Sequence, residues 1–284
     1  MKHRVRALAL ILILLLSALP SLCEEEEVSL FPAAGAPSVT AAPREEAPAP
    51  QEDAPEATAA PAQATPAAAE GEQSSAAREE LIDRMIDLAQ DIYRKTNGRA
   101  QKANSPGDIY VCKNFTVHLF RKNRDDYRMA AFPDVPLVIP NNLPAKQSKP
   151  YSYGISWEEI APEKGNPFEI AAQFFYNRDE SAESNRERAM EFMRQVKRGD
   201  FFQMSAQYYY GIGAHSLVFI RDYDPDTDTV TWTDSNMKGE TRGGVRYGYV
   251  QFEANRKIEW FVDAFCKKGR GATLYRLRDD IIKR

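Results

Sequence analysis

Cysteine and histidine are scarce in this chain, which has three of each among 284 residues. Beyond residue 23 only Cys112, Cys266, His118 and His215 remain. Two cysteines exclude a fold built on several disulfides, although a single bridge between Cys112 and Cys266 stays open. The four side chains are not clustered in the sequence, so no structural zinc site is predicted. We expect neither a metal nor an organic cofactor.

A strong excess of one charge is also missing, since the net charge of the whole chain is −4. Residues 1–77 hold 4 basic and 11 acidic residues, which leaves 33 basic and 30 acidic residues in 78–284. This slight positive balance suits a protein that lingers on an anionic envelope. It gives no electrostatic footprint for nucleic acid, and no basic cluster with interleaved aromatic residues occurs. We expect no nucleic-acid partner.

The apolar run Leu8–Leu16 is short of the roughly 20 residues that a membrane-spanning helix needs. Three basic residues precede it, and small residues occupy the −3 and −1 positions of a cleavage site after Cys23. This pattern predicts a secretory signal peptide over residues 1–23. A retained anchor or a lipoprotein anchor on Cys23 is the alternative. We expect a bacterial protein that is secreted or cell-surface, with no stable membrane insertion after cleavage.

Aromatic residues are nearly absent from residues 24–77, which are dominated by Ala, Pro and Glu. Such a segment buries too little apolar surface to offset its chain entropy. We therefore predict a disordered linker over 24–77 and one folded domain over 78–284.

Within that domain the pattern of apolar residues predicts helices first and strands second. Helical spacing favours helices over 78–95, from Ser105 onward, and over 181–198. Ser105, Pro106 and Asp108 resemble a helix cap. Strand patterns and turn residues then predict the remaining elements. These are strands over 200–205, 215–223, 229–236, 247–252 and 273–277, and a short helix over 258–267.

Residues 125–177 are rich in proline and are predicted to be irregular. The stretch from about 121 to 198 is therefore interpreted as a long insertion between the helices and the strands. Helices followed by an antiparallel sheet define an α+β fold class.

Cysteine catalysis needs a thiol in a positive potential, a base within reach and a group that orients the base. Cys112 is predicted near the start of a helix, where the backbone dipole is positive, and Lys113 adds a positive charge. His118 lies six residues along the same helix, about 120° around its axis, and cannot reach Cys112. It is expected to face solvent. His215, which follows a glycine-rich turn, is the remaining base.

Two residues are candidates for orienting His215. Asp234 and Asn236 alternate onto one face of the predicted strand 229–236, and either can accept the imidazole N–H. Simple turn chemistry at a strand end is the competing interpretation. Substrate contacts are predicted for Tyr110 and for the run Tyr208, Tyr209 and Tyr210, although tyrosines also pack in strands.

The chain resembles the papain-like cysteine amidases and peptidases of the NlpC and CHAP type. The resemblance rests on the helix-borne Cys112, then Gly-Ala-His-Ser-Leu-Val-Phe-Ile from Gly213, and Thr-Asp-Ser-Asn from Thr233. Residues 197–203 are similar to the strand that precedes the histidine in those families. The resemblance to these families covers residues 106–277 and implies N-terminal helices packed on a small antiparallel β-barrel or sheet.

The resemblance implies that Cys112 attacks an amide carbonyl, that His215 protonates the departing amine, and that Asp234 or Asn236 orients His215. The expected activity is an exported thiol hydrolase that cleaves amide bonds in cell-wall peptides. Two alternatives remain. One is a non-catalytic envelope-binding module on the same fold. The other is a transglutaminase-like acyl transferase, although Leu217 stands where its relatives usually have an aromatic residue.

Overall fold

The computed structural model describes residues 66–103, 108–143, 156–208, 211–236 and 241–284. The predicted signal peptide over 1–23 and most of the predicted linker lie outside these residues. The helices are α2 (Pro66–Thr96), α3 (Cys112–Asn123), α4 (Ala182–Arg194) and α5 (Ile258–Phe265). Two single 3₁₀ turns, η1 (Arg124–Asp126) and η2 (Pro162–Lys164), lie between α3 and α4.

The first described helix begins well before the predicted start at residue 78. Helix α2 already includes Pro66, so the linker prediction is wrong for residues 66–77. Leu81, Met85 and Ala89 are fully buried and anchor the helix to the rest of the domain. The Ala, Glu and Gln residues before them have high helix propensity, so the anchored helix extends toward its N-terminus.

Seven strands pair side by side in one sheet, in the order β1-β8-β6-β5-β4-β9-β3, and β7 pairs with β8. The strands are β1 (Gln101–Lys102), β3 (Phe168–Phe175), β4 (Phe201–Tyr208), β5 (Gly211–Phe219), β6 (Thr229–Asn236), β7 (Thr241–Arg242), β8 (Val245–Lys257) and β9 (Gly271–Leu277). Every pairing is antiparallel. The α+β class is therefore confirmed. The described strands form an open sheet and not a closed barrel, because β1 and β3 are its two ends.

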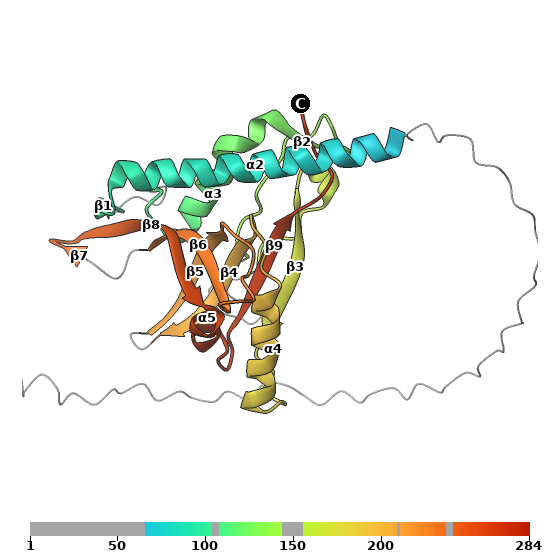
Figure 1. Cartoon of the computed structure of the whole chain (residues 1–284). Coiled ribbons are helices and arrows are strands. Elements are labelled where there is room, and N and C mark those ends of the chain that lie inside the picture. The colour runs from blue at the N-terminus through green and yellow to red at the C-terminus, as the bar shows by residue number, and fades with distance from the viewer. Residues whose placement is uncertain (1–65, 104–107, 144–155, 209–210, 237–240) are drawn as a thin grey trace, which may run out of the picture. The chain divides into compact units, whose positions relative to one another are not determined.

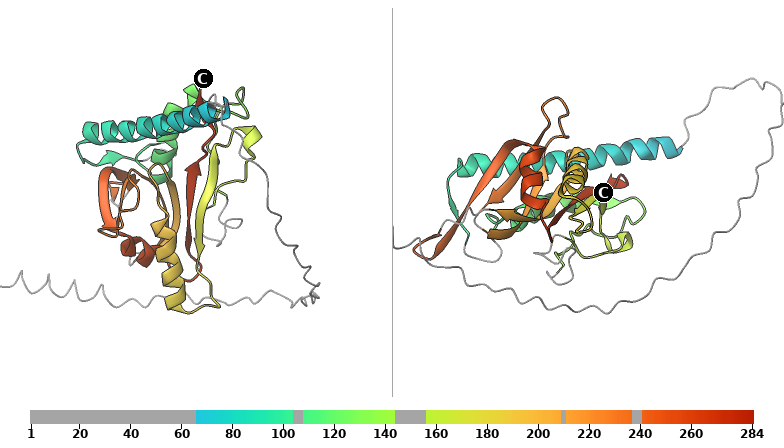
Figure 2. Two further views of the ribbon diagram at one scale, coloured as in Figure 1. Left: turned by 45° about the vertical axis from the view of Figure 1, so that its right-hand side comes forward. Right: turned by 90° about the horizontal axis from the view of Figure 1, so that it is seen from below.

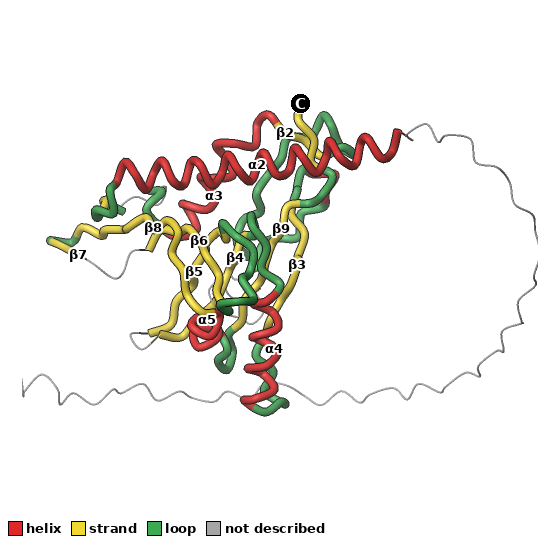
Figure 3. Tube along the Cα trace, in the orientation of Figure 1, coloured by secondary structure: helices red, strands yellow, loops and turns green. Residues whose placement is uncertain are grey.

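Residues 125–177 contain more regular structure than their prolines predict. Strand β3 lies beside β9 in the sheet (Figure 3). A short strand β2 (Tyr127–Met129) pairs with β10 (Ile281–Lys283). The stretch 121–198 is thus part of the fold, since it supplies both β3 and α4. The sequence pattern hid β3 because its pairing register shifts between Ile170 and Ala172, which interrupts the alternation of a regular strand.

Helices cover both faces of the sheet, with α2 and α3 above it and α4 and α5 below it in Figure 1. Figure 2 shows the same arrangement from two further directions. Phe201 belongs to the first core, between α2, α3 and the sheet. Phe202, the next residue of β4, belongs to the second core, against α4 and α5. Both are fully buried, as expected when successive side chains of a strand point to opposite faces.

A buried ion pair joins β9 to the residue before β4. The Asp200 carboxylate is fully buried and accepts hydrogen bonds from Arg276 Nε and one terminal guanidinium nitrogen, both at 2.8 Å. It also accepts the backbone N–H of Lys197 at 2.9 Å. Burial raises the pKa of Asp200, and the hydrogen bond and charge of Arg276 oppose that rise. The carboxylate therefore depends on Arg276 for compensation.

Replacing Arg276 with methionine should lower the free energy of unfolding by about 3 kcal/mol, because it leaves a buried carboxylate without its counter-ion. Urea denaturation measures the change. Arg221→Met is the matched control, since Arg221 pairs with Glu253 on the surface, where both side chains are more than half exposed. It should change stability by less than about 1 kcal/mol. Equal effects of the two substitutions would contradict the dependence of Asp200 on Arg276.

Candidate active site

Three predicted catalytic residues come together from three elements of the fold. Cys112 is the first residue of α3, His215 lies in β5 and Asp234 lies in β6. His215 Nε2 is 2.6 Å from Asp234 Oδ2, and both side chains are buried. The Cys112 thiol lies close enough to the His215 side chain for each group to shift the pKa of the other. Because Nε2 contacts Asp234, Nδ1 is the ring nitrogen left for Cys112.

Of the two candidates for orienting His215, Asp234 is the one that contacts it. Asp234 holds the imidazole, whereas Asn236 is two residues further along β6 and pairs with Tyr249 of β8. A carboxylate in this position stabilises a protonated imidazole, which a neutral amide does much less.

The two strands that carry His215 and Asp234 are not paired with each other at these two residues. Strands β5 and β6 are paired only at Val218–Thr233 and Phe219–Trp232. Helix α3 packs against both strands. At this position the backbone N–H of Ser216 lowers the pKa of the Cys112 thiol. Cys112 and His215 therefore meet where β5 and β6 part.

Helix α3 starts later than the sequence predicts. Its N-cap residue is Val111, which provides no side-chain cap, so the predicted capping by Ser105 and Asp108 is wrong. Ser105 and Pro106 lie outside the described residues, and Asp108 instead accepts a hydrogen bond on its carbonyl from Asn114. Cys112 consequently occupies the first helical position, where backbone N–H groups lack intrahelical partners and the dipole is positive. The backbone N–H of Lys113 also lowers the pKa of the Cys112 thiol.

Opposed effects set the ionisation of this pair. Burial raises the pKa of Cys112, but the hydrogen bond and positive charge of His215 outweigh it, and the pKa of the thiol is lowered. Burial alone lowers the pKa of His215, whereas the hydrogen bonds to Asp234 and Cys112 raise it to about 10. Both directions favour the thiolate–imidazolium form of the pair at neutral pH.

Gln251 is a supporting residue that sequence reasoning missed. Its Nε2 donates to Asp234 Oδ1 at 3.0 Å, so both carboxylate oxygens of Asp234 are held. The two residues are cross-strand partners in β6 and β8. This relation becomes visible only when the register of two distant strands is known. Gln251 thereby fixes the orientation of the group that orients His215.

Lys113 does not act as the simple positive charge that the sequence suggests. Its pKa falls to about 7, chiefly because the amine is buried, although the Cys112 thiolate partly raises it. The amine nitrogen lies 4.3 Å from the ring centroid of Trp157 and has no hydrogen-bond partner in the described part of the chain. Near neutral pH it is therefore only partly charged.

The other predicted site residues have different fates. Tyr110 is half-buried against the first core, and its carbonyl lies against Gly248 of β8. Tyr208 ends β4, while Tyr209 and Tyr210 lie outside the described residues. His118 is half-buried on α3 and is not the solvent-facing residue expected, and burial lowers its pKa.

The alternative of a Cys112–Cys266 disulfide is wrong for this structure, because both cysteines are free thiols. Cys266 directly follows α5 and is half-buried beside the second core. Burial raises its pKa, in the opposite direction to that of Cys112. The two thiols of the domain are therefore in contrasting environments.

No protein-family model, curated protein or solved structure matches this chain. In the described ranges, no group of three or more His, Cys, Asp or Glu side chains is arranged to hold a metal ion. None of the described helices is long and apolar enough to cross a membrane. The case for function therefore rests on the geometry around Cys112.

Cys112 should react with iodoacetamide at a pH well below about 8.5, the pKa at which an ordinary thiol is half ionised. The thiolate is present above the lowered pKa of Cys112 and is lost only as the pH falls through it. His215→Ala removes the main lowering influence and leaves burial, so the rate at pH 6 should fall roughly tenfold to hundredfold.

Mass spectrometry after alkylation gives both cysteine rates in one sample, with Cys266 as the internal control. Cys266 should react only at alkaline pH and should not respond to His215→Ala. A Cys112 rate that follows the same pH curve as that of Cys266 would rule out the ion pair.

Gly248→Ala should disturb the nucleophile from a distance. An added Cβ would lie 2.0 Å from the Tyr110 carbonyl oxygen, so the segment leading into Cys112 must move. The thiolate reactivity of Cys112 at pH 6 should fall about tenfold or more, because its hydrogen bonds need sub-ångström alignment. Gly213→Ala is the control, since a Cβ there meets nothing within 4 Å. Unchanged alkylation in Gly248→Ala would show that the contact is unimportant.

Proposed function

We propose that this protein is a thiol hydrolase that cleaves amide bonds through Cys112, His215 and Asp234. The single observation that carries the proposal is that His215, whose Nε2 lies 2.6 Å from Asp234 Oδ2, also interacts with the Cys112 thiol and lowers its pKa. These are the three roles that cysteine catalysis requires: an activated nucleophile, a base and a group that orients the base.

The first half of the reaction forms a thioester. The Cys112 thiolate attacks the carbonyl carbon of the amide, and the carbonyl oxygen takes up the negative charge. The backbone N–H of Cys112, at the first helical position, donates to that oxygen in this scheme. His215 gives its Nδ1 proton to the leaving nitrogen as the C–N bond breaks, and the amine departs.

In the second half His215 accepts a proton from water while the water oxygen attacks the thioester. The C–S bond then breaks, the carboxylic acid product leaves, and the thiolate–imidazolium pair is restored. Asp234 keeps its hydrogen bond to Nε2 in both halves and stabilises the protonated ring. Gln251 holds the second oxygen of Asp234 throughout.

A papain-like arrangement is part of the proposal. It is supported by a cysteine at the start of a helix that packs where two antiparallel strands part, one carrying the histidine and the next the acid. The substrate class is inferred to be cell-wall peptides. That inference combines the family resemblance with the predicted signal peptide over residues 1–23, which places the protein outside the cytoplasm, secreted or at the bacterial surface.

The full chain should release new amino groups and soluble peptides from purified bacterial cell wall. Cys112→Ser and His215→Ala should each reduce the rate at least about a thousandfold, because the two residues act as one unit. Cys266→Ser is the matched control and should retain full activity. Chromatography with mass spectrometry identifies the products and therefore the bond that is cut.

The other outcomes identify the competing functions. Binding to cell wall without release of any fragment by the intact chain would support a non-catalytic binding module. Products that incorporate a supplied amine in preference to water would identify an acyl transferase. Full turnover in Cys112→Ser would overturn the proposed mechanism.

A further inference from the structure

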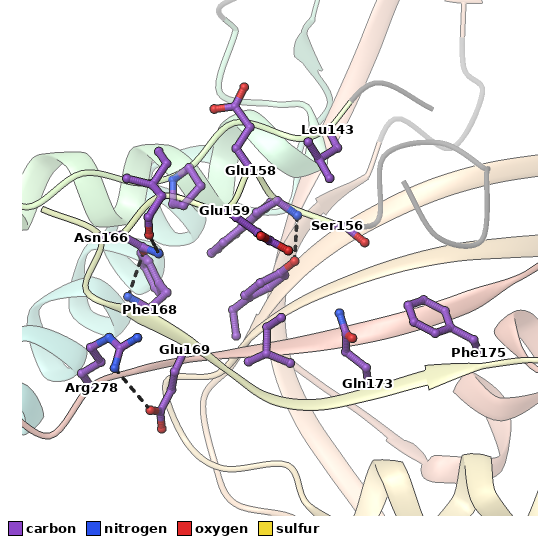
Figure 4. A pocket seen from close by; sticks show the side chains of 15 residues that line it. Leu143, Ser156, Glu158, Glu159, Asn166, Phe168, Glu169, Gln173, Phe175 and Arg278 are labelled. Carbon is purple, nitrogen blue, oxygen red and sulfur yellow. Dashed lines mark hydrogen bonds and ion pairs between the residues drawn. The ribbon is translucent and has the colours of Figure 1, made fainter. Parts of the chain in front are cut away.

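A cavity of about 430 Å³ lies beside the edge strand β3, away from the residues assigned to catalysis. Figure 4 shows its lining side chains, which come from β3, from β9 and Arg278 just after it, and from residues 140–143 and 156–166. Neither Cys112 nor His215 lines it. The proposed mechanism gives this cavity no role.

Aromatic and aliphatic side chains form one part of the lining. Trp157 stacks on Tyr275 with ring centroids 4.0 Å apart and planes 12° apart, and Phe168 meets Trp157 edge-on at 5.0 Å. Ile170 is 54% exposed, which is unusual for a large aliphatic residue of this domain. The three rings are themselves buried, so the exposed Ile170 provides the surface that favours an apolar stem of a ligand.

Acidic side chains form the other part. Glu158, Glu159 and Glu169 line the cavity, and Arg278 is the one basic residue that does so. Arg278 lies 3.8 Å from Glu169 and offsets only that carboxylate. Glu159 is exposed and makes no ion pair with the described residues. The cavity therefore has a negative balance and is complementary to a cation.

A direct chain of contacts connects the cavity to the nucleophile. Lys113 follows Cys112 in α3, and its amine lies 4.3 Å from the centroid of Trp157. Tyr275 is stacked at a similar distance from the same ring, so the two groups occupy opposite faces of the indole. Trp157 is therefore within about 14 Å of the Cys112 Cα, a distance that about four extended residues can span.

The cavity lies beside β3, which is three strands from β5 in the order of the described sheet. A peptide that runs across the sheet, and not along β3, therefore connects the cavity with Cys112.

We infer that this cavity is a specificity subsite for a basic side chain of the lysine type, carried by a peptide substrate two to four residues from the bond cut at Cys112. The alkyl stem lies against Ile170, and the ammonium group meets Glu159, whose carboxylate points into the cavity in Figure 4. The inference rests on the proposed function, because it names a preference of the same catalytic centre. Basic peptides are therefore the preferred substrates.

Peptide chloromethyl ketones test the subsite without requiring turnover. In these reagents the Cys112 sulfur bonds to the methylene carbon and chloride leaves. The position two, three or four residues before that carbon is lysine, norleucine or glutamate. At one of the three positions lysine should alkylate Cys112 of the full chain about threefold to fivefold faster than norleucine, and glutamate should be slowest.

The Glu159→Gln variant should bring the lysine rate to within about twofold of the norleucine rate, and 0.5 M salt should weaken the preference in the same direction. Glu163→Gln is the matched control, because Glu163 is exposed and does not line the cavity. It should keep the preference.

Equal or faster reaction of norleucine at all three positions would overturn the subsite. So would a lysine preference that survives Glu159→Gln. Either result leaves the proposed function intact as long as Cys112 reacts with iodoacetamide at low pH. Failure of that reaction, in contrast, removes the catalytic proposal itself.

Discussion

The separation of β5 from β6 is the constraint on which the candidate site depends. Two paired strands would satisfy the Ser216 N–H within the sheet, but the pairing ends at Val218–Thr233, and the Ser216 N–H instead lowers the pKa of the Cys112 thiol. The start of α3 packs against both strands at this point, and the 2.6 Å contact of His215 with Asp234 joins them again through side chains. Polar side-chain contacts beside the Cys112 thiol thus replace the backbone pairing of β5 with β6 at this point.

Burial shifts the pKa of Cys112, His215 and Lys113 toward their uncharged forms, and the neighbours of each group decide whether that shift prevails. Alone, burial would keep Cys112 protonated, His215 neutral and Lys113 uncharged. The mutual hydrogen bond overcomes burial for the first two, which lie against each other and against Asp234. Lys113 has an aromatic face in place of an anion, so burial prevails and its pKa falls to about 7. Ionisation is therefore concentrated where the chemistry is proposed to occur.

The sequence predicts the parts of this structure that depend on local pattern. The strands 229–236 and 200–205 lie close to their predicted positions. The scarcity of histidine, together with the helical spacing that keeps His118 from Cys112, singles out His215. Three features needed tertiary information. The choice of Asp234 depends on a distance, the role of Gln251 depends on the β6–β8 register, and the real charge of Lys113 depends on burial. Strand β3 was missed for a local reason, since its bulge breaks the alternation that reveals a strand.

The stacking of Trp157 between an amine and a phenol ring also makes it an optical reporter. Of the three tryptophans in the chain, Trp232 and Trp260 stack on each other beside α5, with centroids 6.0 Å apart. Trp157 alone belongs to the first core and borders the acidic cavity. Its emission therefore carries information on that side of the sheet, and the difference between the spectra of the wild-type chain and Trp157→Phe isolates it. A ligand that enters the cavity should therefore change the fluorescence emission of Trp157.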